Sequence, residues 1–194
     1  PEGRLSIETY INAYSDELVK KAILAETARG GQVFYLHNYI SSIKARLTHL
    51  QNILPGIRFA MIHGRMPAAQ IEKTMIAFSR GEFDCLLTTT IIESGIDLPN
   101  VNTMIIERAE EFGLAQLYQL RGRIGRGRSK AYCYLFFSGS AITEDAKKRL
   151  GALREFTHIG SGMRLALRDM EIRGAGEILG KKQHGFVRDV GLEL

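Results

Sequence analysis

Tryptophan is absent from this 194-residue sequence, and cysteine is scarce, with only two residues. The two cysteines do not form a C-x-x-C pair and the five histidines are scattered, so we expect no metal site. No apolar run reaches the roughly 18 residues of a membrane span, and no signal-peptide pattern is present. These absences predict a cytoplasmic protein without a membrane partner.

Two further elements are missing that a complete nucleotide-driven motor needs. One is the phosphate-cradling loop G-x-x-x-x-G-K-[ST], because the stretch 180–183 lacks both the upstream glycine and the hydroxyl. The other is an acidic magnesium-binding box, because the acidic stretch 143–145 does not follow a strand. The chain also starts at Pro1 without a methionine, so we expect an excised fragment that is inactive by itself.

The composition that remains is that of an ordinary globular chain. Hydrophobic residues make up 45% and charged residues 24%. The formal net charge of +5 allows a polyanion partner but does not establish one. Cys85 and Cys133 lie in apolar, strand-like runs, so we expect buried, reduced thiols.

Short apolar runs alternate with helical patterns through the first two thirds of the chain. Strands predicted from these runs are joined by helices through short loops, which indicates an α/β fold with a mostly parallel sheet covered on both faces. Such sheets bind ligands at the carboxyl ends of their strands, which is where His37, His63, Thr90 and Glu107 fall. The predicted strands are 4–10, 32–36, 58–62, 85–89, 103–106 and 132–136, and the predicted helices lie near 16–29, 39–52, 68–78 and 114–120.

The alternation of predicted strands and helices ends near Ser140. The stretch 142–156 reads as one helix, a glycine-containing break follows, and 163–170 reads as a second helix, which together resemble a helical hairpin. A basic, glycine-punctuated tail follows. We therefore divide the chain into a domain over 1–139 and a hairpin plus loop over 140–194.

The segment from Ala115 to Arg126 combines arginines and glycines in an unusual way. Its apolar residues recur at helical spacing, yet each glycine weakens a helix by about 1 kcal/mol relative to alanine. The absent side chains let the backbone approach another surface closely, and guanidinium groups can grip phosphate oxygens in a bidentate way. A solvated basic helix end is the alternative interpretation.

Five residues of this segment fit the pattern Q-x-x-G-R-x-G-R: Gln119, Gly122, Arg123, Gly125 and Arg126. The pattern resembles the last signature motif of superfamily 2 helicases and translocases. The resemblance implies a RecA-like second motor domain in which Arg123 and Arg126 are catalytic. It also implies that Gln119 and Gly122 lie near ATP and Mg²⁺, which are bound mainly by a first motor domain in cis.

A second motif begins where the predicted strand 85–89 ends. Thr88, Thr89 and Thr90 precede a segment containing Gly95 and Asp97, which is similar to the fifth motif of the same superfamily. The resemblance implies that the threonines touch nucleic-acid phosphates and that Gly95 and Asp97 face the nucleotide. A turn capped locally by threonine and aspartate is the alternative.

Another pair of residues follows the predicted strand 58–62. The run Met61-Ile-His-Gly-Arg-Met66 and the earlier run Gln32 to Asn38 are similar to the two motifs that open the second motor domain. The resemblance implies that His63 and Gly64 face nucleic acid. A turn histidine that is satisfied locally is the alternative.

The C-terminal tail restricts the resemblance to a smaller group within superfamily 2. Its sequence Arg168-Asp-Met-Glu-Ile-Arg-Gly-Ala-Gly176, followed by Gln183-His-Gly185, resembles the translocation module shared by transcription-repair coupling factors (Mfd) and the helicase RecG. Carried over by position, the module residues are Arg149, Arg173 and Gln183. His184 departs from the pattern, where the family usually has serine.

The run Ile106-Glu-Arg-Ala-Glu-Glu-Phe-Gly-Leu-Ala-Gln-Leu-Tyr-Gln119 matches the coupling factors more closely than RecG. The resemblance implies a fragment of an ATP-dependent double-stranded DNA translocase that displaces stalled RNA polymerase and leads to recruitment of excision-repair proteins. Two alternatives stay open. One is a RecG-like helicase acting on branched DNA, and the other is a non-enzymatic nucleic-acid-binding domain.

Overall fold

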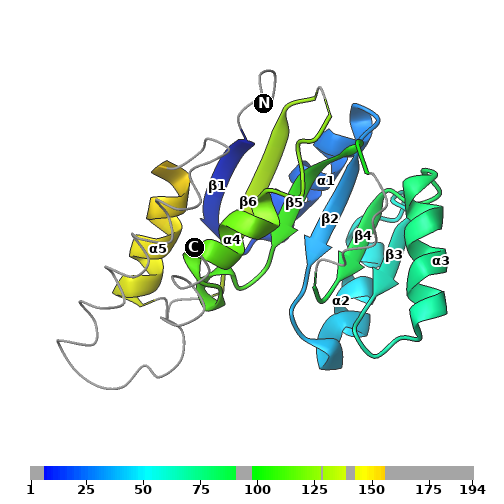
Figure 1. The fold of residues 1–194 in the computed structure, drawn as a ribbon, viewed down its shortest axis with the longest axis horizontal. Helices are drawn as coiled ribbons and strands as arrows, with labels where there is room; N and C mark the ends of the chain where they lie inside the picture. Colours follow the sequence, from blue (N-terminus) through cyan, green and yellow to red (C-terminus); the bar gives the residue numbers. More distant parts are fainter. Residues whose placement is uncertain (1–6, 91–97, 128, 139–142, 156–194) are drawn as a thin grey trace, which may run out of the picture.

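A computed structural model of the chain describes residues 7–90, 98–127, 129–138 and 143–155. Within these ranges the fold is one parallel sheet with helices on both faces (Figure 1). In chain order its elements are β1 (Ile7–Ala13), α1 (Asp16–Ala28), β2 (Gln32–Leu36), α2 (Ile40–Ile53), β3 (Phe59–Ile62), α3 (Ala68–Ser79), β4 (Cys85–Thr88), β5 (Val101–Ile106), the 3₁₀ turn η1 (Ala109–Glu111), α4 (Leu114–Arg121), β6 (Ala131–Phe137) and α5 (Glu144–Glu155).

The sheet has six strands in the order β1-β6-β5-β2-β4-β3, and every pairing is parallel. Because all strands run in one direction, their carboxyl ends lie at one edge, the lower edge in Figure 1. The central strands β2, β4 and β5 are buried along their whole length, as expected for strands covered on both faces. The predicted α/β architecture is confirmed.

Alternate side chains of each strand feed two separate cores. Phe34 and Leu36 of β2 pack with α3, α4 and α5 on one face. Val33 and Tyr35 of the same strand pack with α1 and α2 on the other face. This alternation follows from the two-residue period of a strand and explains why β2 reads as a continuous apolar run.

Most predicted elements agree closely with those observed, including β2 at 32–36 and the helix beginning at Leu114. The turn η1 was not predicted, because three residues at a strand end carry no periodic signal. The first helix of the expected hairpin is present as α5, which packs against η1, α4 and β1. Its second helix and the tail lie outside the described residues, so the division at 139 stays a prediction. In the described ranges, no helix combines the length and the apolar character required to cross a membrane.

Cys85 in β4 and Cys133 in β6 are both fully buried and not disulfide-bonded. Burial raises the pKa of the Cys133 thiol to about 12 and raises that of Cys85 as well, so neither forms an appreciable thiolate near neutral pH. The expectation of buried, reduced cysteines is confirmed.

We therefore expect neither thiol to react with a soluble thiol reagent in the native protein, and both to react after unfolding in guanidinium chloride. Mass spectrometry after pulse labelling with iodoacetamide measures both states. Rapid native labelling of Cys133 would contradict the burial of β6.

Candidate nucleotide pocket and its surroundings

A pocket of ≈ 320 Å³ opens at the carboxyl edge of the sheet, where β2 and β4 end beside α4. Residues from three separate chain segments line it, and both amide and guanidinium donors are among them. The lining residues are Leu36, Asn38, Thr89, Thr90, Phe112, Gln116, Gln119, Leu120 and Arg123. The structure thus brings together four of the predicted site residues in one hollow.

Helix α4 positions the predicted motif residues at this pocket. It begins after Gly113, whose backbone N–H donates to the Gln116 side chain at 3.1 Å, and it buries Leu114 and Leu117 against the sheet. Gln119 is therefore left exposed on the side that faces the pocket. Gly122 follows directly as the C-cap of the helix.

The three arginines of the segment 115–126 have different environments. Arg121 is only 2% exposed, donates to the Thr9 hydroxyl at 3.2 Å and lies over the Tyr118 ring at 5.4 Å. Burial lowers the pKa of the Arg121 guanidinium. Arg123 is half-buried and lines the pocket, whereas Arg126 is exposed and is not among the residues lining it. Only Arg123 of the predicted catalytic pair lies in the pocket.

The glycines beside these arginines allow close backbone packing. Gly125 has φ +71°, and a Cβ there would lie 2.9 Å from the Ala131 Cβ. A Cβ on Gly127 would lie 2.8 Å from the Pro99 carbonyl oxygen. Gly122, in contrast, has an ordinary helical φ of −67°. The segment after α4 can therefore lie against β6 and Pro99 only with glycine at 125 and 127.

Replacing Gly125 by alanine should lower the free energy of unfolding by about 1–3 kcal/mol, because the left-handed φ and the contact with Ala131 both penalise a Cβ. Gly122→Ala is the matched control, since its nearest contact would be 3.4 Å from the Gln119 carbonyl oxygen. Urea unfolding followed by circular dichroism measures both variants. Equal stability of the two would contradict the described backbone of this turn.

The threonine cluster divides between a turn and the pocket. Thr88 is buried, its hydroxyl donates to the Thr90 carbonyl, and it accepts from the Thr90 N–H at 3.3 Å. Thr89 and Thr90 line the pocket. The Thr88 hydroxyl thus takes part in a local turn, while the other two threonines face the pocket. Gly95 and Asp97 lie outside the described residues.

His63 and Gly64 follow β3 and are not among the residues that line this pocket. The His63 Nδ1 accepts from the Arg65 backbone N–H at 3.2 Å, which is the local arrangement typical of a turn histidine. Gly64 is exposed. Their role in binding nucleic acid stays a prediction.

Arg149 of α5 donates to the Glu110 carbonyl oxygen at 3.1 Å, so α5 is hydrogen-bonded to η1. Glu110 also accepts from the Ser138 hydroxyl at 2.6 Å, which joins η1 to the end of β6. Arg173 and Gln183, the predicted partners of Arg149, lie outside the described residues.

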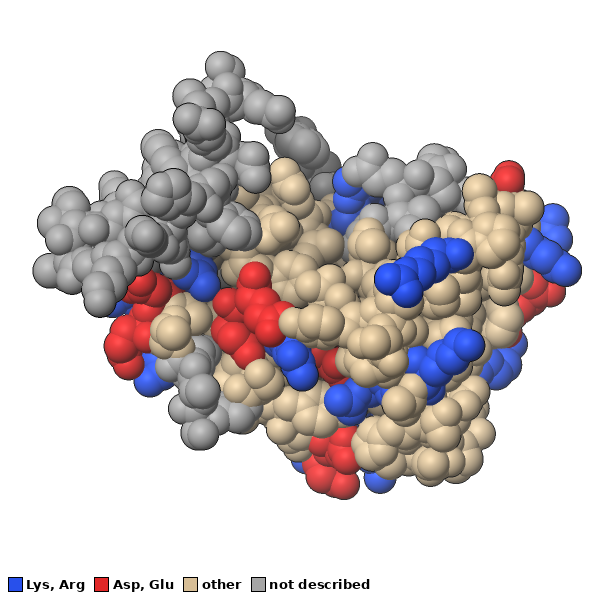
Figure 2. Space-filling model, turned by 90° about the horizontal axis from the view of Figure 1, so that it is seen from below, with Lys and Arg blue, Asp and Glu red and all other residues tan. Residues whose placement is uncertain are grey.

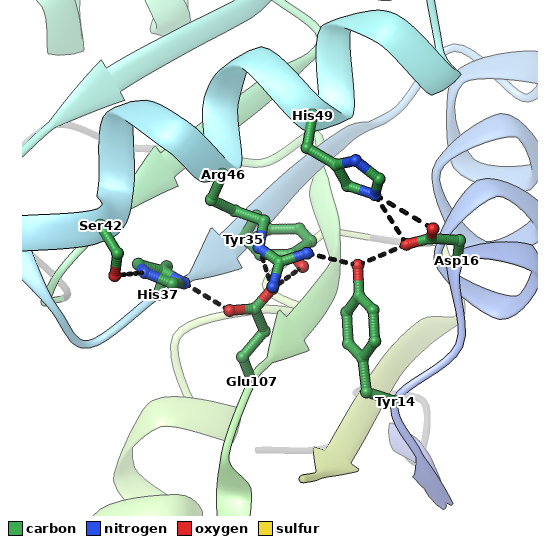
Figure 3. Close-up of polar contacts among 8 residues, drawn as sticks. All are labelled: Tyr14, Asp16, Tyr35, His37, Ser42, Arg46, His49 and Glu107. Carbon is green, nitrogen blue, oxygen red and sulfur yellow. Dashed lines mark hydrogen bonds and ion pairs between the residues drawn. The ribbon is translucent and has the colours of Figure 1, made fainter. Parts of the chain in front are cut away.

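Sequence reasoning did not select a buried polar network centred on Glu107 (Figure 3). The Glu107 carboxylate accepts from the Tyr35 hydroxyl, contacts His37 Nδ1 and pairs with Arg46 Nε at 2.9 Å. A second hollow of ≈ 370 Å³ lies here. The detectable signal was a polar residue directly after an apolar strand, as His37 follows β2 and Glu107 follows β5.

The network continues from Arg46 to the first turn of α1. Arg46 donates to the Tyr14 hydroxyl at 2.7 Å, and Tyr14 donates to Asp16 at 2.8 Å. His49 contacts the same carboxylate at 3.0 Å and lowers the pKa of Asp16. These contacts connect α1, α2 and the end of β5. Among the described residues, no three His, Cys, Asp or Glu side chains are grouped so that they could bind a metal ion.

The carboxyl edge of the sheet is seen face-on in Figure 2. Lys and Arg side chains are spread across the middle and right of this face, and the largest acidic patch lies left of centre. Phosphate groups are attracted to such basic surfaces.

The parallel sheet with a polar pocket at its carboxyl edge is the architecture of RecA-like domains. The helicase conserved C-terminal domain model matches residues 14–128, more than half of the chain. The chain belongs to this family. Over its whole length it is 49% identical to the transcription-repair-coupling factor of Staphylococcus haemolyticus and 48% identical to that of Staphylococcus aureus strain USA300. The predicted resemblance to the coupling factors is confirmed. The chain spans 17% of the length of these curated relatives.

Solved structures agree with this placement. RecG bound to a three-way DNA junction matches with a TM-score of 0.75 and 35% identity, over 98% of this chain and 25% of that one. The C-terminal domain of the DEAD-box protein Dbp5 matches with a TM-score of 0.56 at 17% identity, over 75% of this chain and 84% of that one. The second likeness supports the RecA-like fold alone.

Proposed function

We propose that this chain is the second motor domain, together with the translocation module, of an ATP-dependent double-stranded DNA translocase that displaces stalled RNA polymerase during transcription-coupled repair. The observation that carries the proposal is the pocket in which Gln119 and Arg123 meet Thr89 and Thr90, in a chain similar throughout to transcription-repair-coupling factors. A cytoplasmic location, with excision-repair proteins as partners through other regions, is part of this proposal.

The donor set suits a phosphate-bearing ligand. The Arg123 guanidinium and three side-chain amides line a hollow of ≈ 320 Å³, to which no residue in the described ranges contributes a carboxylate. ATP with Mg²⁺, when bound, supplies a phosphoryl group whose hydrolysis releases free energy. Residues of a first motor domain in cis would hold most of the nucleotide, because this sequence lacks a phosphate-cradling loop.

In this proposal Arg123 and Arg126 place positive charge where negative charge develops during hydrolysis. Arg123 lines the pocket, and Arg126 lies one short turn further along the chain, on the surface. An exposed arginine beside a pocket is suited to reach a ligand held on a facing domain. Gln119, Gly122, Gly95 and Asp97 complete the proposed nucleotide contacts.

DNA contacts are assigned to Thr88, Thr89 and Thr90, at and just after the end of β4, and to His63 and Gly64, just after β3. All of these lie at the same edge of the sheet. Contacts to phosphates carry no information about the base sequence, so DNA binding should be insensitive to sequence. Because these contacts are electrostatic, binding should also weaken strongly as the salt concentration rises. Movement along duplex DNA is assigned to Arg149, Arg173 and Gln183.

The full-length protein with Arg123→Ala should hydrolyse ATP about 10³-fold more slowly, because an arginine finger contributes roughly 10³ to 10⁵ in rate. Arg126→Ala should also slow ATP hydrolysis. Arg80→Ala, an exposed arginine at the opposite edge of the sheet, is the control and should match the wild type. Near-normal ATP turnover of both motif variants would contradict the catalytic role proposed for Arg123 and Arg126.

Arg149→Ala should retain ATP hydrolysis but lose displacement of a protein obstacle from DNA, as should Arg173→Ala and Gln183→Ala. Lys147→Ala, exposed on the same helix, is the control. Release of a stalled RNA polymerase and reversal of a model fork are measured side by side. Fork reversal without polymerase release would favour a RecG-like helicase, and the absence of any ATP hydrolysis would favour a non-enzymatic binding domain.

A further inference from the structure

The short turn η1 lies on the chain between β5 and the helix that lines the pocket. Phe112 follows η1 directly and lines the pocket, and the chain then continues through α4 to Gln119 and Arg123, which line the same hollow. The same turn also packs against α5, which lies at the β1 end of the sheet (Figure 1). One continuous stretch of chain therefore contacts both the pocket and α5.

Glu110, in the middle of η1, is hydrogen-bonded at two points to the chain that forms α5. Its side-chain Oε1 accepts from the backbone N–H of Ser138 at 3.1 Å and from the hydroxyl of the same serine at 2.6 Å. Its main-chain carbonyl oxygen accepts from Arg149 Nη2 at 3.1 Å. Ser138 directly follows β6 on the segment that leads to α5, and Arg149 lies within α5. A single residue of η1 therefore contacts both the entry to this helix and the helix itself.

Apolar contacts join the same elements. Ala109 of η1 is fully buried and Leu150 of α5 is only 2% exposed. Both belong to the core cluster that also contains Leu114 and Leu117 of α4. Apolar packing is non-directional, so it resists separation of α5 from η1 but specifies their relative orientation only weakly. Hydrogen bonds require defined distances and angles, and those of Glu110 supply that constraint here.

The neighbouring carboxylate of η1 is engaged by a different part of the domain. Glu111 accepts from the Tyr39 hydroxyl at 2.6 Å and pairs with Arg108 Nη1 at 3.6 Å. Tyr39 is the N-cap residue of α2, so Glu111 joins η1 to the start of that helix. Two adjacent glutamates of one turn thus have separate attachments, and only that of Glu110 leads to α5.

We propose that Glu110 is a positioning residue that couples the nucleotide pocket to α5, because it makes η1 and α5 move together. This inference rests on the proposed function, in which ATP hydrolysis drives movement along duplex DNA. Packed side chains and hydrogen-bond networks carry such coupling between sites. Glu110 is not among the residues that line the pocket. Removing its carboxylate should therefore separate ATP hydrolysis from movement rather than slow hydrolysis.

The test uses the full-length protein, with ATP hydrolysis on duplex DNA and displacement of a triplex-forming oligonucleotide from that DNA measured side by side. Glu110→Ala should hydrolyse ATP at nearly the wild-type rate but displace the oligonucleotide about tenfold more slowly, the usual effect of losing a hydrogen bond to a charged group. Ser138→Ala removes one of the two donors and should slow displacement less. Because both residues act through one contact, the double variant should be no slower than Glu110→Ala.

Two further variants serve as controls. Glu110→Gln keeps a side-chain oxygen that can accept from Ser138, so it should displace the oligonucleotide at nearly the wild-type rate. Glu111→Ala removes the adjacent carboxylate of the same turn and should leave both activities unchanged. Thermal unfolding is measured for every variant. Ser138 is exposed, so Ser138→Ala retains the fold even if Glu110→Ala does not.

Three results overturn the inference while leaving the proposed function in place. The first is wild-type displacement by both Glu110→Ala and Ser138→Ala. The second is a parallel fall of ATP hydrolysis and displacement, which a purely structural role would produce. The third is Glu110→Gln displacing the oligonucleotide as slowly as Glu110→Ala. A wild-type protein that hydrolyses no ATP, or hydrolyses it without displacing the oligonucleotide, overturns the proposed function itself.

Discussion

The parallel direction of all six strands is the constraint on which the rest of the molecule depends. Each strand delivers the residue that follows it to the same edge, so side chains far apart in sequence meet there. Asn38, Thr89 and Arg123 line one hollow for this reason. The two faces of the sheet bury separate apolar cores, which leaves this edge for polar chemistry.

The arginine-rich segment shows how packing gives similar residues different environments. Helical spacing turns Arg121 toward the sheet and Thr9, while the residues after Gly122 leave the helix and reach the pocket and the surface. A buried guanidinium at Arg121 is tolerated because it lies over the Tyr118 ring and donates to the Thr9 hydroxyl. Glycines at 125 and 127 then let the chain pass close to β6 and Pro99.

Periodicity was sufficient to predict most of the strands and α-helices, because buried strands and amphipathic helices leave clear patterns, as 32–36 and 68–78 show. It could not give the strand order, since pairing depends on contacts between distant segments. The pocket residues Gln119 and Arg123 were found through their motif. The sequence placed His37 and Glu107 at the carboxyl edge of the sheet but did not select them, or Asn38, as site residues. The role of a single polar residue after a strand depends on which strand ends become neighbours.

Arg149 donates to the main-chain carbonyl of residue 110, and this has an evolutionary consequence. Every amino acid presents that oxygen, so a lineage can exchange the side chain at this site, and give up its tie to Ser138, without severing the attachment of α5. Divergence at position 110 therefore keeps this hydrogen bond, whereas replacing Arg149 by a residue without a donor removes it.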